Sequence, residues 1–375
     1  MAEDDADTNE NAELISGLEK GDLRPTVYEG GLKTWECAID LAKLVAAEEI
    51  PSLLSDMAGG GGEDVDIIEL GAGTAIPSLA ILHHLLSRPA PQSPPRRLIR
   101  FVFADYNAAV LRLVTVPNIL LTWQTCRHHH LNHSQQQQQQ QQPEGNIPPN
   151  IDHGTDAENS LNRDRWDGGR ADEDDVDDDD EQPDLDIEPA LLSAFREDLH
   201  ARGICLSFIA GAWSPAFVEL ALPNRLPSSP SSSPSSSPPQ PRLTNLLLIL
   251  ASETIYSPSS LHAFSETLLA LLRRGGGLGS TCTCTSTSAP PLEPAAGSAV
   301  DTDKTPPPKY NSKALIAAKE VYFGVGGGVD EFLGVMRDVG RREGRASSDD
   351  DGFSVKERAE IRNEGVGRVI LEVTI

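Results

Sequence analysis

One stretch constrains the fold more than any other: a short apolar run that leads directly into a glycine turn. The run covers residues 65–70, the turn Gly71-Ala72-Gly73 follows it, and an apolar segment begins at Pro77. Such a run is typical of a buried parallel strand, and the segment after Pro77 predicts a helix. In open α/β sheets, ligands bind beyond the carboxyl ends of strands, where glycine lets the backbone approach closely. The stretch therefore predicts a nucleotide-type cofactor site.

The glycine turn does not identify the cofactor, because a tight strand-to-helix turn with no ligand has the same sequence. A dinucleotide fingerprint has Gly or Ala at its sixth position, where this chain has Ile76. A dinucleotide domain also usually begins with this strand, whereas a helical segment at 32–49 precedes it here. Both points favour S-adenosylmethionine over NAD and disfavour a nicotinamide-dependent oxidoreductase.

Much of the 375-residue chain, whose formal charge is −26, has low-complexity sequence. Such tracts lack the apolar area that offsets the entropy of ordering, so we expect them to be disordered. The rest, roughly 220 residues, is enough for one α/β domain. We therefore predict an acidic disordered tail and a single domain at 23–375. The predicted disordered segments are 1–22 and insertions at about 128–190, 226–241, 275–312 and 341–352.

The charge pattern and the cysteines limit the possible partners and the cellular compartment. An acidic run at 172–181 is a solvated tract or attracts a basic partner, and its sign disfavours direct binding to nucleic acid. The five cysteines form no disulfide framework, and we find neither a signal peptide nor an apolar run of about 18 residues. We expect a soluble protein of a reducing compartment, with no membrane partner.

Alternating strands and helices predict a Rossmann-like α/β fold with a mostly parallel, twisted, seven-stranded sheet and helices on both faces. The parallel strands are expected at 65–70, 98–104, 204–209, 245–250 and 314–321, and an antiparallel pair at 355–361 and 367–374. The helices are expected at 32–49, 77–87, 108–114, 260–272 and 330–339. In the first helix, the spacing predicts one apolar stripe of Trp35, Ile39, Ala42 and Ala46, flanked by Leu32, Leu41, Leu44 and Val45.

Five segments in chain order are more specific than the glycine turn: 28–37, 69–75, 105–107, 252–256 and 321–329. Together they resemble the protein-histidine N-methyltransferases of the seven-β-strand class. The strings Glu-Gly-Gly-Leu-Lys-x-Trp-Glu-Cys and Tyr-Phe-Gly-Val-Gly-Gly-Gly-Val are specific to that family. The resemblance covers about 22–125, 195–222, 243–273 and 313–375.

The resemblance implies a class I methyltransferase that uses S-adenosylmethionine and methylates a histidine side chain at the τ nitrogen. Human and yeast members of the family modify a histidine of large-subunit ribosomal protein three, so a basic ribosomal protein is the expected partner. The family acts in the cytoplasm and the nucleus. We also expect a monomer that needs no metal, and we attribute His128, His129, His130 and His133 to low-complexity sequence.

The cofactor residues are predicted from their chemistry, in agreement with the family pattern. Gly71 and Gly73 let the backbone approach the aminoacyl part, and Glu69 is placed to reach the amino group. Asp105 offers two acceptor oxygens to the ribose hydroxyls, unless it is only a helix N-cap. Tyr106 and Asn107 are expected to flank the ribose and adenine.

Further cofactor residues come from later segments and from the resemblance. Trp213 offers a π face for adenine, the backbone of Ala212 an edge contact, and Gly211 and Ser252 lie beside them. The family usually has an acid at position 212, and its loss costs about 1–3 kcal/mol if a buried donor stays unpaired. The resemblance implies that the residues of 34–38 line the methionine end: Thr34, Trp35, Glu36, Cys37 and Ala38. For Trp35, a purely structural place in the core is the alternative.

Methylation of histidine requires one ring nitrogen to present its lone pair while an acceptor holds the N–H of the other. Glu253 and Tyr256, just past the fourth strand, are the predicted catalytic residues that supply this acceptor. A backbone carbonyl of 323–328 is the rival acceptor, and a structural ion pair is the alternative role for Glu253. Two other functions stay open: a lysine methyltransferase of the same fold, and a ribosome-assembly factor without turnover.

Overall fold

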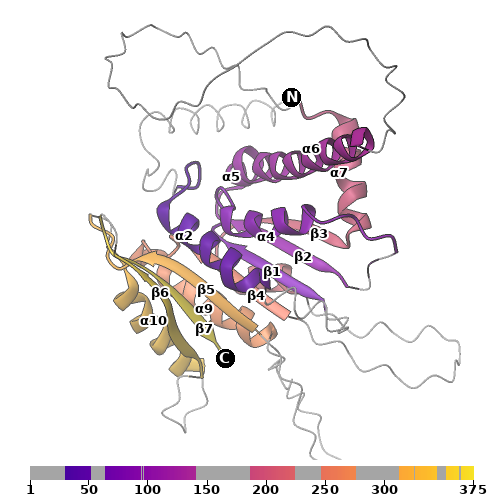
Figure 1. Cartoon of the computed structure of the whole chain (residues 1–375). Helices are drawn as coiled ribbons and strands as arrows, with labels where there is room; N and C mark the ends of the chain where they lie inside the picture. Colours follow the sequence, from indigo (N-terminus) through magenta and orange to yellow (C-terminus); the bar gives the residue numbers. More distant parts are fainter. Residues whose placement is uncertain are drawn as a thin grey trace, which may run out of the picture.

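The computed structural model describes residues 30–51, 64–93, 95, 97–140, 186–223, 246–275, 312–324, 326–343, 352–362 and 365–375. These residues form three layers, with one twisted sheet between two layers of helices (Figure 1). This arrangement confirms the predicted α/β fold of the class I methyltransferase type.

The sheet has seven strands in the order β3-β2-β1-β4-β5-β7-β6. Six neighbouring pairs connect them; the four pairs from β3 to β5 are parallel, and β7 is antiparallel to both β5 and β6. The predicted number of strands and the predicted antiparallel pair are therefore confirmed. The strands are β1 Val65–Leu70, β2 Ile99–Asp105, β3 Ile204–Ala210, β4 Leu246–Ser252, β5 Ser312–Lys319, β6 Ser354–Ile361 and β7 Arg368–Thr374.

Two groups of helices cover the two faces of the sheet (Figure 1). A short stretch of α5 Ala108–Val110 and the π-helical η2 Leu111–Thr115 leads from β2 into α6. One face carries α2 Glu36–Leu44, the π-helical turn η1 Val45–Glu49, α4 Ile76–Leu86, α6 Val116–Gln140 and α7 Pro189–Ala201. The other carries α8 Pro215–Ala221, α9 Pro258–Gly275 and α10 Val329–Glu343.

The central strands explain why the sheet needs both layers. Every residue of β1 is buried, and successive residues enter opposite cores: Ile67 packs with α2 and α4, and Ile68 with α9. Strand β4 is apolar and buried from Leu246 to Ala251, as expected for a strand covered on both faces. The carboxyl ends of β1 and β4 consequently lie together at the centre of one sheet edge.

The predicted stripe on the first helix is wrong. Helix α2 begins at Glu36, and its buried residues are Cys37, Ala38, Leu41 and Leu44, while Ile39 is 43% exposed. Glu36, Asp40 and Lys43 form the polar side of this helix, and the opposite side, which packs against α4 and β5, is the buried one.

Some predicted boundaries also differ from the structure. Strand β5 ends at Lys319, and Val321 forms only an isolated bridge with Gly328. The helix predicted at 108–114 corresponds to α5 and η2 and continues into α6, which was not predicted. Helix α6 reaches Gln140 and so extends past residue 128, where we placed the first insertion. Helices α7 and α8 are additions to the predicted elements. The predicted tail at 1–22 and the insertion at 226–241 lie outside the described residues, as do 141–185, 276–311 and 344–351.

Candidate functional site

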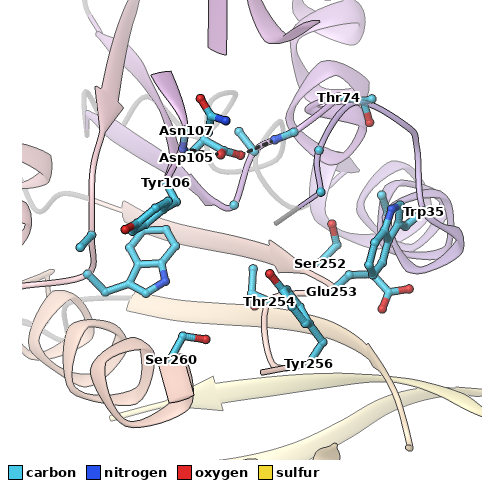
Figure 2. Close-up of a pocket in the computed structure, with 18 of the residues that line it drawn as sticks. Trp35, Thr74, Asp105, Tyr106, Asn107, Ser252, Glu253, Thr254, Tyr256 and Ser260 are labelled. Atoms are coloured by element: carbon cyan, nitrogen blue, oxygen red, sulfur yellow. Dashed lines mark hydrogen bonds between the residues drawn. The ribbon is translucent and has the colours of Figure 1, made fainter. Parts of the chain in front are cut away.

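A pocket of about 610 Å³ opens at the carboxyl ends of β1, β2 and β4 (Figure 2). This is the edge at which parallel α/β sheets bind ligands. Segments far apart in the sequence meet in its wall, from the turn before α2 to the connection between β4 and α9. Twelve of the predicted site residues line it: Trp35, Ala38, Gly71, Gly73, Asp105, Tyr106, Asn107, Ala212, Trp213, Ser252, Glu253 and Tyr256.

Asp105 lies at the end of β2 and connects two parts of the wall. Its Oδ2 accepts a hydrogen bond of 3.0 Å from the N–H of Gly73, and its Oδ1 accepts one of 3.0 Å from the N–H of Asn107. Burial raises the pKa of Asp105, and these backbone N–H groups oppose that rise. Each oxygen has a second lone pair, so the carboxylate retains the capacity to accept further bonds from a ligand.

The glycine turn after β1 brings backbone close to backbone. Gly73 has φ +50°, and a Cβ at this position would lie 3.2 Å from the Cα of Gly31. The hydroxyl of Thr115 donates to the Gly73 carbonyl at 2.6 Å. A Cβ on Gly71, at φ +68°, would lie 2.7 Å from Cγ2 of Thr254. The turn thus requires glycine for its conformation and for its close contacts.

Aromatic and polar side chains form the wall beyond Asp105. The Tyr106 side chain is exposed on the pocket rim (Figure 2). Trp213 packs edge-on against Phe217 at 5.1 Å and Phe264 at 6.1 Å between ring centroids, which fixes the indole. The Oδ1 of Asn107 accepts from Ala109 N, so Asn107 caps the following helix and the alternative role of Asp105 as N-cap is wrong.

Five predicted residues do not line the pocket. Thr34 donates to the Thr74 hydroxyl at 3.1 Å, and so supports a lining residue from behind. Cys37 is fully buried, and burial together with the charge of Glu253 raises the pKa of its thiol. Glu36 points outward to Lys319 at 3.5 Å, because it occupies the exposed side of the first turn of α2. Gly211 ties strand ends together, donating to the Asp105 carbonyl at 3.0 Å.

Glu69 is the fifth of these residues, and it faces α4. Its Oε2 accepts from the N–H of Ser78 at 3.0 Å, which satisfies a donor in the first turn of that helix. Only 1% of the residue is exposed, and burial raises its pKa to about 8. The alternation of side chains along β1 explains the difference, because Glu69 shares the face of Ile67.

The two predicted catalytic residues occupy different environments. The Tyr256 hydroxyl points into the cavity (Figure 2). Glu253 lines the base of the pocket with φ +55°, an uncommon conformation for a residue other than glycine. Both oxygens of Glu253 are shielded from solvent and lack a hydrogen-bond partner within the described residues. Tyr256 is therefore the better placed of the two to touch a ligand.

Lys319, at the end of β5, connects Glu253 to the aromatic part of the wall. Its Nζ lies 3.8 Å from Glu253 Oε1 and 5.7 Å from the centroid of the Trp35 ring. The Trp35 ring lies 6.1 Å from that of Tyr256, which in turn lies 6.3 Å from Tyr322. The ammonium thus compensates a buried carboxylate and packs on the tryptophan, in keeping with the predicted alternative of an ion pair for Glu253.

The glycine-rich loop after β5 packs on the chain's own backbone. A Cβ on Gly327 would lie 2.6 Å from the carbonyl oxygen of Tyr256, and one on Gly328 would lie 2.6 Å from that of Glu320. These glycines hence allow the loop to contact the β4–α9 connection closely. Gly324 differs, because a Cβ added there would meet no described atom within 4 Å.

The sequence did not assign several residues that line the pocket. Ser259, Ser260 and Ala263 belong to the first turns of α9, where spacing alone does not reveal the side that faces the cavity. Gly30, Gly31 and Lys33 precede α2 within a family string, which was a usable signal. The remaining lining residues are Ala72, Thr74, Ala108 and Thr254.

The histidines of α6 lie away from this pocket. His130 Nε2 is 3.0 Å from the Leu86 carbonyl oxygen. In the described ranges, no cluster of three His, Cys, Asp or Glu side chains is placed to hold a metal ion. None of the helices that the structure describes combines the length and hydrophobicity needed to cross a bilayer.

Comparison with known proteins gives relatives along almost the whole chain. The chain is 29% identical over 342 residues to histidine protein methyltransferase 1 of Saccharomyces cerevisiae, covering 90% of this chain and 65% of the relative. It is 27% identical to the protein of that name in Schizosaccharomyces pombe (88% and 63% covered) and 24% identical to a homologue in Rattus norvegicus (97% and 62%). The chain thus spans somewhat less than two thirds of the length of these relatives.

No protein-family model matches the chain. The relatives nevertheless share one name, and they confirm the family resemblance that the five sequence segments predicted.

Gly327 and Gly324 offer a matched test of the close loop contact. Both have φ +80°, so replacement by alanine costs each variant about 1–2 kcal/mol of backbone strain. Gly327→Ala must also displace the Tyr256 carbonyl, and we expect a further loss of about 1–3 kcal/mol. Urea unfolding of the two variants measures the difference, and equal stabilities would contradict the contact.

The buried Glu69 predicts a pH-dependent loss of stability. The unfolded chain releases this proton near pH 4.5, whereas the folded protein keeps it to about pH 8. The folded state binds more protons between these values, so its stability falls as pH rises through this interval. Glu69→Gln keeps an acceptor for Ser78 but does not ionise. The free energy of unfolding of the wild type should therefore fall relative to Glu69→Gln between about pH 5 and 8; parallel curves would refute the assignment.

Proposed function

We propose that this chain, a relative of the histidine protein methyltransferases over almost its whole length, transfers a methyl group from S-adenosylmethionine to a histidine side chain of a protein. The observation that carries the proposal is the pocket at the ends of β1, β2 and β4, in a chain with these relatives. We place its action in the cytoplasm and the nucleus, as the family resemblance implies.

The pocket fits the proposed cofactor. Gly71 and Gly73 line the pocket without side chains, so the aminoacyl part can approach their backbone closely. Asp105 is held by two backbone donors and has lone pairs left for vicinal hydroxyls. Tyr106 and Trp213 supply aromatic surface for a purine. When bound, S-adenosylmethionine supplies a methyl group that its sulfonium already activates.

The chain must then orient the target imidazole and keep water out. Histidine has an ordinary pKa near 6.5, so much of it is neutral and nucleophilic near pH 7. We assign the Tyr256 hydroxyl as the group that accepts the N–H of the non-reacting nitrogen, because it points into the cavity (Figure 2). The Glu253 side chain lies beneath this site, with Lys319 Nζ at 3.8 Å from its Oε1, where a carboxylate favours the imidazolium that forms.

The proposed substrate is a basic ribosomal protein of the large subunit. The net charge of −26 attracts a basic partner, and the acidic run at 172–181 adds to this attraction. The family resemblance points to ribosomal protein three and to the τ nitrogen. If the product were methyl-lysine, the assignments of the fold and the cofactor would stand, but the modified side chain would be lysine.

The first experiment follows labelled methyl from S-adenosylmethionine into purified large-subunit ribosomal proteins, with mass spectrometry of the modified residue. We expect methyl-histidine from the wild type. Asp105→Ala should lower cofactor affinity by about 100-fold or more, measured by calorimetry, because a charged acceptor is lost. Circular dichroism checks its fold. Absence of both transfer and cofactor binding in the wild type would favour a binding factor without turnover.

Tyr256→Phe tests the orienting hydroxyl. Removal of one hydrogen bond to the imidazole should lower kcat by about 10–100-fold, while cofactor affinity stays unchanged. Single-turnover methyl transfer measures the first quantity and calorimetry the second. An unchanged kcat would move the acceptor to a backbone carbonyl of the glycine-rich loop.

A further inference from the structure

Two apolar side chains are exposed immediately beside the pocket. Phe323 is 78% exposed and Val321 is 48% exposed. Tyr322 lies between them and turns inward, with 7% exposed and its ring 6.3 Å from that of Tyr256. The segment thus has an inner side that supports the pocket wall and an outer side that presents Val321 and Phe323.

Backbone contacts tie together the two ends of the loop that carries these side chains. Gly326 N donates to the Tyr322 carbonyl at 3.2 Å, and Val329 N donates to the Glu320 carbonyl at 3.2 Å. Val321 and Gly328 form an isolated antiparallel bridge. A surface that is already ordered loses little conformational entropy when a partner binds. The backbone on both sides of Phe323 is tied in this way.

Carboxylates flank the two apolar side chains along the chain. Glu320 precedes them, and Asp330 and Glu331 follow in the first turn of α10. Among the described residues, Arg362 lies near the Glu320 carboxylate and offsets part of its charge, with Nη2 at 4.0 Å from Oε1. An apolar patch with a negative rim suits a partner that brings an apolar side chain flanked by positive charge.

We propose that Val321 and Phe323, with Asp330 and Glu331, form the docking surface for the polypeptide that carries the target histidine. This inference rests on the proposed function, because a histidine that reaches Tyr256 must arrive on a protein chain. Tyr322 lies 6.3 Å from Tyr256 between ring centroids and is followed by Phe323. Successive Cα atoms are about 3.8 Å apart, so a bound chain that runs from Tyr256 toward Phe323 reaches it within a few residues. The expected segment has an apolar residue close to the histidine and basic residues beyond it.

The test compares Phe323→Ala with Leu220→Ala, which truncates another exposed apolar side chain, 66% exposed on α8. Methyl transfer to purified large-subunit ribosomal proteins gives KM and kcat, and calorimetry gives cofactor affinity. We expect Phe323→Ala to raise KM about tenfold, with kcat and cofactor affinity within about twofold. Leu220→Ala should leave all three unchanged.

A charge pair of variants tests the negative rim. Asp330→Asn and Asp338→Asn remove the same charge from the first turn and from a later turn of α10, and both side chains are exposed. Asp330→Asn should raise KM several-fold at low salt and much less at high salt, and Asp338→Asn should have little effect. Melting curves monitor the helix-dipole contribution of Asp330.

The outcomes separate the two proposals. Transfer by the wild type with an unchanged KM in Phe323→Ala would overturn the docking surface alone. If Phe323→Ala also lost enough cofactor affinity or melting temperature to explain its higher KM, the docking surface would be overturned as well, because Phe323 would then have a structural role. Absence of transfer by a wild type that binds the cofactor would overturn the proposed substrate, and the docking surface with it.

Discussion

The Asp105 carboxylate connects the strand ends on which the pocket is built. It accepts from Gly73 after β1 and from Asn107 after β2, while Thr115 of η2 holds the carbonyl of the same Gly73. The turn after β1, the end of β2 and η2 are thereby fixed to one another. Because the bonds are made within the protein, the acceptor is already oriented before any ligand enters. The wall formed by Tyr106 and the glycine turn depends on this arrangement.

Sequence reasoning succeeded where the argument depended on the ends of parallel strands. Apolar runs such as 246–251 identify the central strands, and the polar or glycine residues after them necessarily meet at one edge of the sheet. This is why Gly71, Asp105 and Tyr256, which are distant in sequence, could be assigned to one pocket. The family resemblance then added Trp35 and Ala38, which no periodicity identifies as pocket residues.

The same reasoning failed where tertiary packing decides which way a side chain points. Glu36 and Cys37 stand beside the lining residue Trp35, yet one turns to solvent and the other is buried. Ser259 and Ser260 lie in a helix whose orientation over the cavity depends on its packing with α10 and β5. The glycine-rich loop packs closely on the carbonyls of Tyr256 and Glu320, a contact that spacing does not indicate. None of these outcomes follows from local propensity.

The π-helical turn η1 divides the first helical segment into two registers. Glu48 follows Leu41 by seven residues and in a regular α-helix would share its buried side. Instead Glu48 is half-exposed, and the next residue, Glu49, is buried with Lys313 Nζ at 2.5 Å from its Oε2. The wider turn acts as a one-residue insertion, so the inward-facing position moves from residue 48 to residue 49. A relative whose helix is regular here would therefore align with this chain only through a one-residue gap within 45–49.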